Sequence, residues 1–185
     1  MRIISGRYKG TKLFLPPDDL IRPTSDRAKE MVFSTLNSIL LKKKLKLDNM
    51  KVLDFFCGTG GLGIECLSRG FKKVCFIDNS KIAIDLTKKN LSLIRAENTA
   101  VIYNSDFRKL KLIEFKADIF FLDPPYNKFN ISEILESIKN AGLINKRSIG
   151  IIELPKSFIE NESACFKIIK KKKLSNSLFL FIETE

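Results

Sequence analysis

The sequence contains no histidine, and its four cysteines show no C-x-x-C spacing. Without histidine, neither a Ser-His-Asp nor a Cys-His nucleophile can be assembled. Zinc sites commonly use paired cysteines or cysteine together with histidine, so we expect no metal site. We interpret the cysteines as reduced thiols that fill apolar space. Any reaction carried out by this chain must therefore proceed without an imidazole base.

The sequence also lacks an apolar run of the roughly 18 residues that would cross a bilayer. The segment from Met1 to Gly6 has neither the apolar region nor the cleavage site of a secretory signal. We therefore expect a cytoplasmic protein with no membrane partner. The chain has 185 residues, of which 44% are hydrophobic and 29% charged, a globular composition with enough length for one well-filled core.

Acidic residues are the minority among the charged side chains. The chain has 21 Asp and Glu against 33 Lys and Arg, a formal net charge of +12. Such an excess favours polyanionic partners, above all nucleic acid. A basic surface that is simply solvated explains the same excess, so charge alone leaves both interpretations open.

From Lys51 onward, short apolar runs alternate with helical stretches. Because the apolar runs lack in-and-out alternation, they indicate strands buried on both faces, as in a parallel sheet covered by helices. The pattern therefore predicts an α/β fold of the Rossmann-like kind. We expect strands at 51–56, 73–77, 100–103, 118–122 and 148–153, and helices at 61–69, 81–94 and 131–141.

The two ends of the chain follow other patterns. Residues 2–15 alternate apolar and polar around two glycines, which predicts a small β-hairpin or arm, and prolines mark the linker that follows. Ser25 is a good N-cap for a helix from about Asp26 to Leu41. The last segments, 165–171 and 177–183, predict a hairpin. We expect an arm and linker at 1–24 and one α/β domain at 25–185.

A glycine-rich turn directly follows the first predicted strand. Gly58-Thr59-Gly60-Gly61-Leu62-Gly63 matches G-x-G-x-x-G, where Gly58 and Gly60 would let a cofactor approach the backbone. Asp78, with Asn79 beside it, ends the next strand and could accept hydrogen bonds from both ribose hydroxyls. Nicotinamide dinucleotides and S-adenosylmethionine both fit this arrangement.

Asp54 favours S-adenosylmethionine over a dinucleotide. A carboxylate beside the first glycine would repel a pyrophosphate, which such sites receive on helix amides. The methyl donor instead carries a sulfonium and an ammonium, and a nearby carboxylate attracts both. A structural Asp54 that caps the glycine turn is the alternative.

Asp106 and Phe107 follow the predicted strand 100–103. The carboxylate could accept a hydrogen bond from an adenine amino group, while the phenyl ring covers the ring face. Equally, Asp106 could be the N-cap of a short helix and Phe107 a core residue.

The stretch Asp123-Pro124-Pro125-Tyr126 ends the predicted strand 118–122. An exocyclic amine is a poor nucleophile, and acceptors aimed at its hydrogens stabilise the positive charge that develops during attack. Asp123 and the Pro124 carbonyl suit that role, because the two prolines fix the corner and remove competing donors. Tyr126 offers a ring on which a base can stack. A rigid turn without catalytic function is the alternative.

Taken together, these motifs and two near the amino terminus resemble one family. The further motifs are Arg2-Ile3-Ile4-Ser5-Gly6-Arg7-Tyr8-Lys9-Gly10 and Arg22-Pro23-Thr24-Ser25-Asp26-Arg27. Over essentially its full length, the chain resembles the RsmD family of bacterial 16S ribosomal RNA guanine-N2 methyltransferases. The resemblance implies a class I S-adenosylmethionine-dependent fold, with a mostly parallel seven-stranded sheet that ends in an antiparallel hairpin. It also implies methylation of a guanine amine in the 30S subunit or its assembly intermediate, and we expect a monomer.

The basic arm suits such a target. Arg7, Lys9, Arg22 and Arg27, with Thr24 between them, could contact RNA phosphates and hold a flipped nucleotide in register. A solvated arm is the alternative.

Two other functions stay open. A DNA adenine-N6 or cytosine-N4 methyltransferase would share the Asp-Pro-Pro-Tyr motif, but sequence-specific versions need a recognition region for which this chain has no room. A catalytically inactive ribosome-binding protein of the same fold would not need the carboxylates to be retained.

Overall fold

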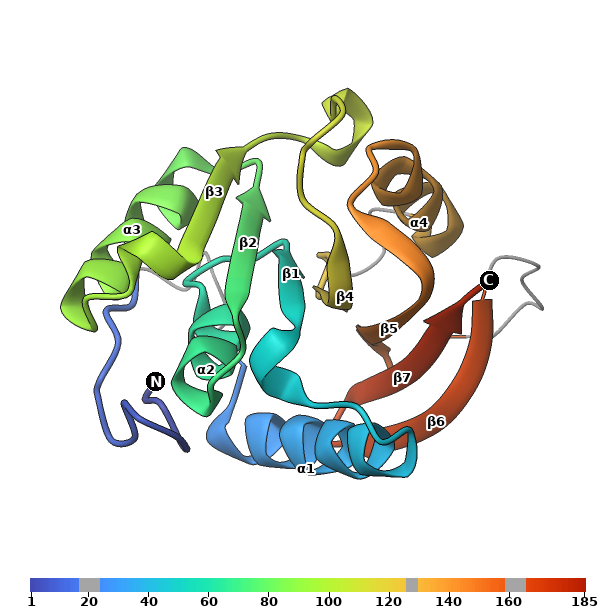
Figure 1. The fold of residues 1–185 in the computed structure, drawn as a ribbon, viewed down its shortest axis with the longest axis horizontal. Helices are drawn as coiled ribbons and strands as arrows, with labels where there is room; N and C mark the ends of the chain where they lie inside the picture. Colours follow the sequence, from blue (N-terminus) through green and yellow to red (C-terminus); the bar gives the residue numbers. More distant parts are fainter. Residues whose placement is uncertain (17–23, 126–129, 159–165) are drawn as a thin grey trace.

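The computed structural model describes residues 1–16, 24–125, 130–158 and 166–185. It contains a seven-stranded sheet with the order β3-β2-β1-β4-β5-β7-β6 (Figure 1). The strands β1 to β5 run parallel, and β7 is antiparallel to both of its neighbours. This confirms the predicted fold class, including the carboxyl-terminal hairpin. The strands are β1 (Lys51–Phe55), β2 (Lys73–Asp78), β3 (Ala100–Asn104), β4 (Ala117–Leu122), β5 (Ile144–Pro155), β6 (Phe166–Leu174) and β7 (Ser177–Thr184).

Helices cover both faces of the sheet (Figure 1). Buried residues of α1, α2 and α3 pack into one apolar cluster, and those of α4 and η3 pack into a second cluster. The two clusters lie on opposite faces of the sheet. This agrees with the prediction of a sheet covered by helices on both faces, which was made from strands that are apolar throughout. The α-helices are α1 (Asp26–Lys42), α2 (Gly61–Arg69), α3 (Lys81–Leu93) and α4 (Ile131–Asn140), and the short 3-10 helices are η1 (Leu47–Asn49), η2 (Glu97–Thr99) and η3 (Phe107–Lys109).

Local sequence explains where three of these helices begin. Ser25 and Ser80 accept hydrogen bonds from backbone amides in the first turns of α1 and α3, and Asn130 does the same for α4. Such caps satisfy amides that have no partner within the helix. Helix α1 accordingly starts at Asp26, as its N-cap predicts.

The amino-terminal arm is fastened to α2. The buried carboxylate of Glu65 accepts hydrogen bonds from the amides of Ile4 and Ser5, at 2.9 and 3.0 Å. At Gly6, whose φ is +83°, a Cβ would lie 1.9 Å from the Ser68 carbonyl oxygen. Only glycine allows the chain to pass so close. The arm is thus held against the helix that follows the glycine turn.

Two expectations about the backbone need refinement. Strand β5 is longer than the predicted 148–153, and its extra residues include Arg147 at a φ of +65° beside a register shift against β4. The amino-terminal hairpin is reduced to a single antiparallel bridge between Arg2 and Lys12. A division of the chain after residue 24 stays a prediction. Within the described ranges, no helix is both long and apolar enough to span a membrane.

Candidate active site

Four parallel strands each carry an acid after an apolar run, close to the same edge of the sheet. The acids are Asp54 of β1, Asp78 of β2, Asp123 directly after β4, and Glu153 of β5. In the sheet, Asp54 pairs with Phe121, which is two residues before Asp123. Leu122 pairs with Ile152, so the residues that follow them, Asp123 and Glu153, are neighbours on adjacent strands. Because side chains alternate along a strand, Asp54, Asp123 and Glu153 lie on one face.

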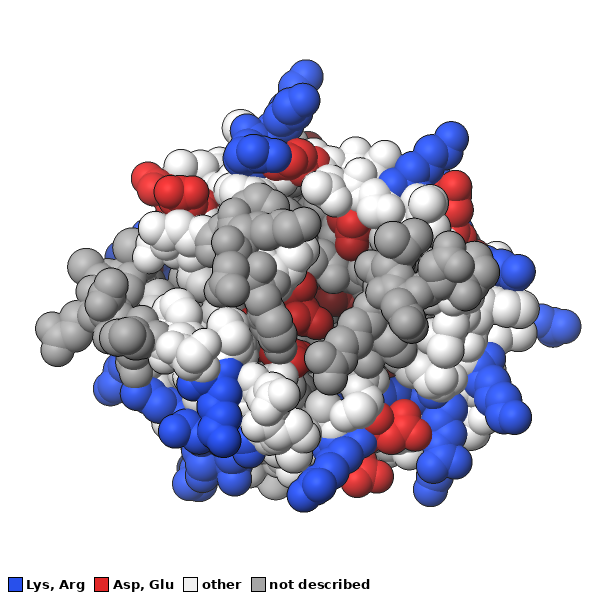
Figure 2. All heavy atoms as spheres, turned by 180° about the vertical axis from the view of Figure 1, so that it is seen from behind, with Lys and Arg blue, Asp and Glu red and all other residues white. Residues whose placement is uncertain are grey.

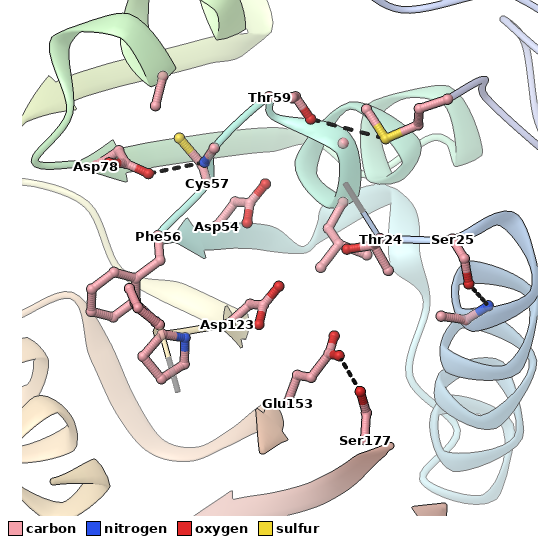
Figure 3. Close-up of a pocket in the computed structure, with 18 of the residues that line it drawn as sticks. Thr24, Ser25, Asp54, Phe56, Cys57, Thr59, Asp78, Asp123, Glu153 and Ser177 are labelled. Carbon is pink, nitrogen blue, oxygen red and sulfur yellow. Dashed lines mark hydrogen bonds between the residues drawn. The ribbon is translucent and has the colours of Figure 1, made fainter. Parts of the chain in front are cut away.

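These acids line a single cavity of about 750 Å³. In Figure 3, the side chains of Asp54, Asp123 and Glu153 project into the same space. The described residues that line the cavity include four carboxylates and no lysine or arginine. Figure 2 shows acidic side chains in the central hollow of one face and basic side chains around its periphery. The acidic cavity therefore lies within a basic protein.

The glycine turn is held by the acid at the end of β2. Asp78 accepts hydrogen bonds from the amides of Gly58 and Ser80, at 3.0 and 2.9 Å. Gly58 and Gly60 have φ angles of +53° and +76°, in the left-handed region that glycine adopts without strain. Asp78 therefore shapes the turn that lines the cavity, in addition to the ligand contact predicted for it.

Asp54 both caps α2 and faces the cavity. Its Oδ2 accepts a hydrogen bond of 2.8 Å from the Gly63 amide. Burial raises the pKa of Asp54 to about 7; the Gly63 hydrogen bond opposes that rise, and the charge of Asp78 adds to it. A Cβ on Gly63 would lie 2.3 Å from the Phe76 ring, so glycine lets α2 pack closely on β2. The capping role that was the alternative is therefore observed at this carboxylate, and its contact with the methyl donor stays a prediction.

Helix α3 supports the glycine turn from outside. The Thr87 hydroxyl donates to the Gly58 carbonyl oxygen, and the Asn90 amide donates to the Thr59 carbonyl oxygen, both at 3.0 Å. Both side chains are fully buried. The turn is therefore a rigid part of the cavity wall.

The opposite end of the cavity is formed by the predicted proline corner and by β5. Asp123, Pro124 and Pro125 all line the cavity, whereas Tyr126 lies outside the described residues. The Ser177 hydroxyl donates a hydrogen bond of 2.6 Å to Oε1 of Glu153, which orients that side chain from β7 (Figure 3). The structure thus brings the proline corner and the glycine turn to the same cavity.

Asp106 and Phe107 occupy a different environment. Asp106 accepts a hydrogen bond from the Arg108 amide as the N-cap of η3, and its hydrogen bonds with the Arg108 side chain and amide lower its pKa to about 2. Phe107 is buried, and its carbonyl oxygen accepts a hydrogen bond from Ser137 of α4. Neither residue is among the described residues that line the cavity. Their contact with adenine stays a prediction.

The residues expected to bind RNA fall into two groups. Thr24 lines the cavity, as do Ser25 and Asn79. The side chains of Arg7, Lys9 and Arg27 are exposed on the surface outside it. Arg22 lies outside the described residues.

Among the cavity residues that were not anticipated from the sequence, Glu153, Phe56 and Ile82 show why they were missed. Glu153 was detectable, because Ile151-Ile152-Glu153 repeats the pattern of an apolar run ending in an acid. Phe56 lines the cavity with a φ of +63°, a conformation that its sequence does not indicate. Ile82 is 59% exposed at the start of α3 and also lines the cavity. Its position depends on how α3 approaches β2, which no local pattern reveals.

The chain is similar to several known proteins. The family model described as "Conserved hypothetical protein 95" matches residues 1–183. Ribosomal RNA small subunit methyltransferase D of Haemophilus influenzae is 38% identical over 137 residues, 72% of this chain and 67% of that protein. The protein of the same name from Escherichia coli is 29% identical over 161 residues, 87% of this chain and 76% of that protein. The solved structure of Escherichia coli yhhF, described as a methyltransferase, superposes with a TM-score of 0.83 at 26% identity, covering 100% of this chain and 98% of that one.

Proposed function

Because this chain belongs to the RsmD family of small-subunit ribosomal RNA methyltransferases, we propose that it methylates the exocyclic N2 amine of a guanine in 16S ribosomal RNA, with S-adenosylmethionine as the methyl donor. The observation that carries this proposal is the meeting of two motifs in one cavity. The glycine turn with Asp54 forms one end, and the corner of Asp123, Pro124 and Pro125 forms the other.

The residues at the glycine turn fit the proposed donor. A cavity of about 750 Å³ falls within the usual range for small-molecule sites. Asp54 supplies negative charge for a cationic ligand, and Asp78 presents a carboxylate at the position where a ribose is received in such folds. When bound, the donor supplies a methyl group activated by its attachment to a sulfonium. Asp54, Gly58, Gly60, Asp78 and Asn79 are the residues proposed to hold it.

The proline corner fits an amine acceptor. Asp123 and the Pro124 carbonyl would accept the two N2 hydrogens and so draw the nitrogen toward tetrahedral geometry. Acceptors that are already in place stabilise the positive charge as it develops on the nitrogen, without reorganisation during the reaction. The methylated amine then releases one proton to solvent, so no histidine is required. We propose that Tyr126, which follows Pro125 in the sequence, stacks on the base.

The target is proposed to be RNA in the 30S subunit or an assembly intermediate. A net charge of +12 favours a polyanion, and Arg7, Lys9, Arg22 and Arg27 are proposed to contact phosphates. Thr24, which lines the cavity, is proposed to contact the same substrate. The protein is further proposed to act as a cytoplasmic monomer. Neither DNA methylation nor a purely binding role gains support from a feature of the cavity.

Methyl transfer from radiolabelled S-adenosylmethionine tests this proposal. Undermethylated 30S subunits, naked 16S RNA and DNA are incubated in parallel, and the labelled nucleosides are then identified by chromatography. The expected product is N2-methylguanosine from ribosomal RNA. Label in N6-methyladenine or N4-methylcytosine of DNA would instead identify a DNA enzyme, and donor binding without transfer to any of the three would support an inactive binding protein.

A further inference from the structure

The acceptor end of the cavity carries a second carboxylate that the methyl transfer does not itself require. Glu153 lies on the strand beside the one that ends at Asp123, and the register places the two acids as neighbours on the same face. Figure 3 shows both side chains directed into the cavity. A base whose amine reaches Asp123 can therefore present one of the ring atoms beside that amine to Glu153.

Ser177 gives this carboxylate a defined orientation. Its hydroxyl donates to Oε1 of Glu153 at 2.6 Å, across the antiparallel pairing of β5 and β7. Phe179, two residues further along β7, pairs with Glu153 and also lines the cavity. The carboxylate is therefore held beside an apolar wall, a suitable setting for reading the edge of a flat base.

The chemistry of the bases makes such a carboxylate selective. Beside its N2 amine, guanine carries the N1–H donor on one side and the N3 acceptor on the other. Adenine and cytosine carry a ring nitrogen acceptor next to theirs. A carboxylate offers only hydrogen-bond acceptors. It can bond to the N1–H of guanine, whereas it faces an acceptor in the other two bases.

We propose that Glu153, oriented by Ser177, selects guanine by accepting the N1–H hydrogen bond while Asp123 and Pro124 engage the N2 amine. This inference rests on the proposed function and specifies how the base is chosen. In that arrangement, two neighbouring acceptors on the protein match two neighbouring donors on the base. Sites built around such a bond reject analogues that lack the donor far more strongly than apolar pockets reject size variants.

The test uses small subunits reconstituted with a synthetic RNA segment. The position that the wild-type protein methylates carries either guanine or 2-aminopurine, which keeps the amine but has an acceptor at N1. We measure kcat/KM on both substrates for the wild type, for Glu153→Gln and for Ser177→Ala. Glu136→Gln, an exposed change on α4, is the matched control. Calorimetric titration with S-adenosylmethionine checks that each variant still binds the donor.

The wild type is expected to prefer guanine by about a hundredfold or more. Glu153→Gln should reduce that preference at least about tenfold, because glutamine can donate a hydrogen bond to the N1 of 2-aminopurine. The affinity of this variant for S-adenosylmethionine should stay within about twofold of wild type. Ser177→Ala should fall between them, and Glu136→Gln should match the wild type. 2-Aminopurine also lacks the O6 of guanine, but this difference is the same for every variant. The ratio of one variant's preference to that of the wild type therefore isolates the contribution of N1.

An unchanged preference in Glu153→Gln, or a loss of donor affinity in that variant, would overturn the inference while leaving the proposed function in place. Absence of N2-methylguanosine from the wild-type reaction on guanine would instead overturn the proposed function, and the inference with it.

Discussion

The two ends of the cavity use carboxylates in different ways. At the glycine turn, Asp54 and Asp78 accept hydrogen bonds from backbone amides of the protein itself. At the other end, Glu153 is oriented by a side-chain hydroxyl, and Asp123 stands at a corner fixed by prolines. Asp54 and Asp78 therefore hold the backbone that forms the cavity wall, whereas Asp123 and Glu153 project from it.

This difference predicts how the two ends respond to mutation. Changes that remove an acceptor oxygen of Asp54 or Asp78 should alter local structure and ligand affinity together, because the same carboxylates are proposed to serve both. Changes at the proline corner should affect reaction rate with little effect on donor binding. Experiments that separate affinity from turnover therefore test the distinction directly.

The largest effect is expected at the proline corner. Asp123→Ala should reduce kcat by about 100-fold or more, the usual cost of losing one preorganised dipole in a reaction site. Donor affinity should stay within about twofold of wild type, as measured by calorimetry. Asp85→Ala, an exposed change on α3, serves as the control. Full turnover in Asp123→Ala would remove this residue from the mechanism.

An intermediate effect is expected from the titration of Asp54. Because burial raises its pKa to about 7, the carboxyl is mostly protonated at pH 6 and mostly ionised at pH 8. A cationic donor favours the ionised form, so affinity should increase with pH up to about 7, by at most about tenfold per unit, and then level off. The same shift should make the ligand-free fold less stable as pH increases from about 4 to 7, since the folded state then binds the extra proton.

Asp54→Asn provides the matched comparison for that titration. Its amide oxygen can still accept the hydrogen bond from Gly63, so the turn should be preserved. The affinity of this variant for S-adenosylmethionine should be lower and nearly independent of pH between 6 and 8. A pH dependence equal to that of the wild type would assign the titration to another group.

The smallest effect is expected outside the cavity. Charge reversal at the exposed Arg27 should weaken RNA binding modestly and reduce the slope of log affinity against log salt by about 1 or 2. Lys146→Glu places the same change in exposed charge at the opposite end of the sheet, where β5 begins, and should leave the slope unchanged. If the charge reversal at Arg27 left the salt slope unchanged, as Lys146→Glu is expected to do, α1 would not face the RNA.

Local sequence patterns were enough to predict most of the fold and part of the site. The apolar runs predicted β1 to β5 because a buried parallel strand needs apolar residues on both faces. The glycine turn and the proline corner were recognisable because backbone geometry demands those residue types. The role of Glu153 depends on β5 lying beside β4, and that order is set by packing across the whole sheet. The capping role of Asp106, by contrast, depends on the three residues of η3, which directly follow it in the sequence.

The most direct test is a crystal structure of the protein soaked with S-adenosylmethionine. The account predicts that the ribose lies within hydrogen-bonding distance of Asp78, and that the transferable methyl carbon faces Asp123 and the Pro124 carbonyl. A donor bound elsewhere, or one whose methyl group points away from that corner, would contradict it.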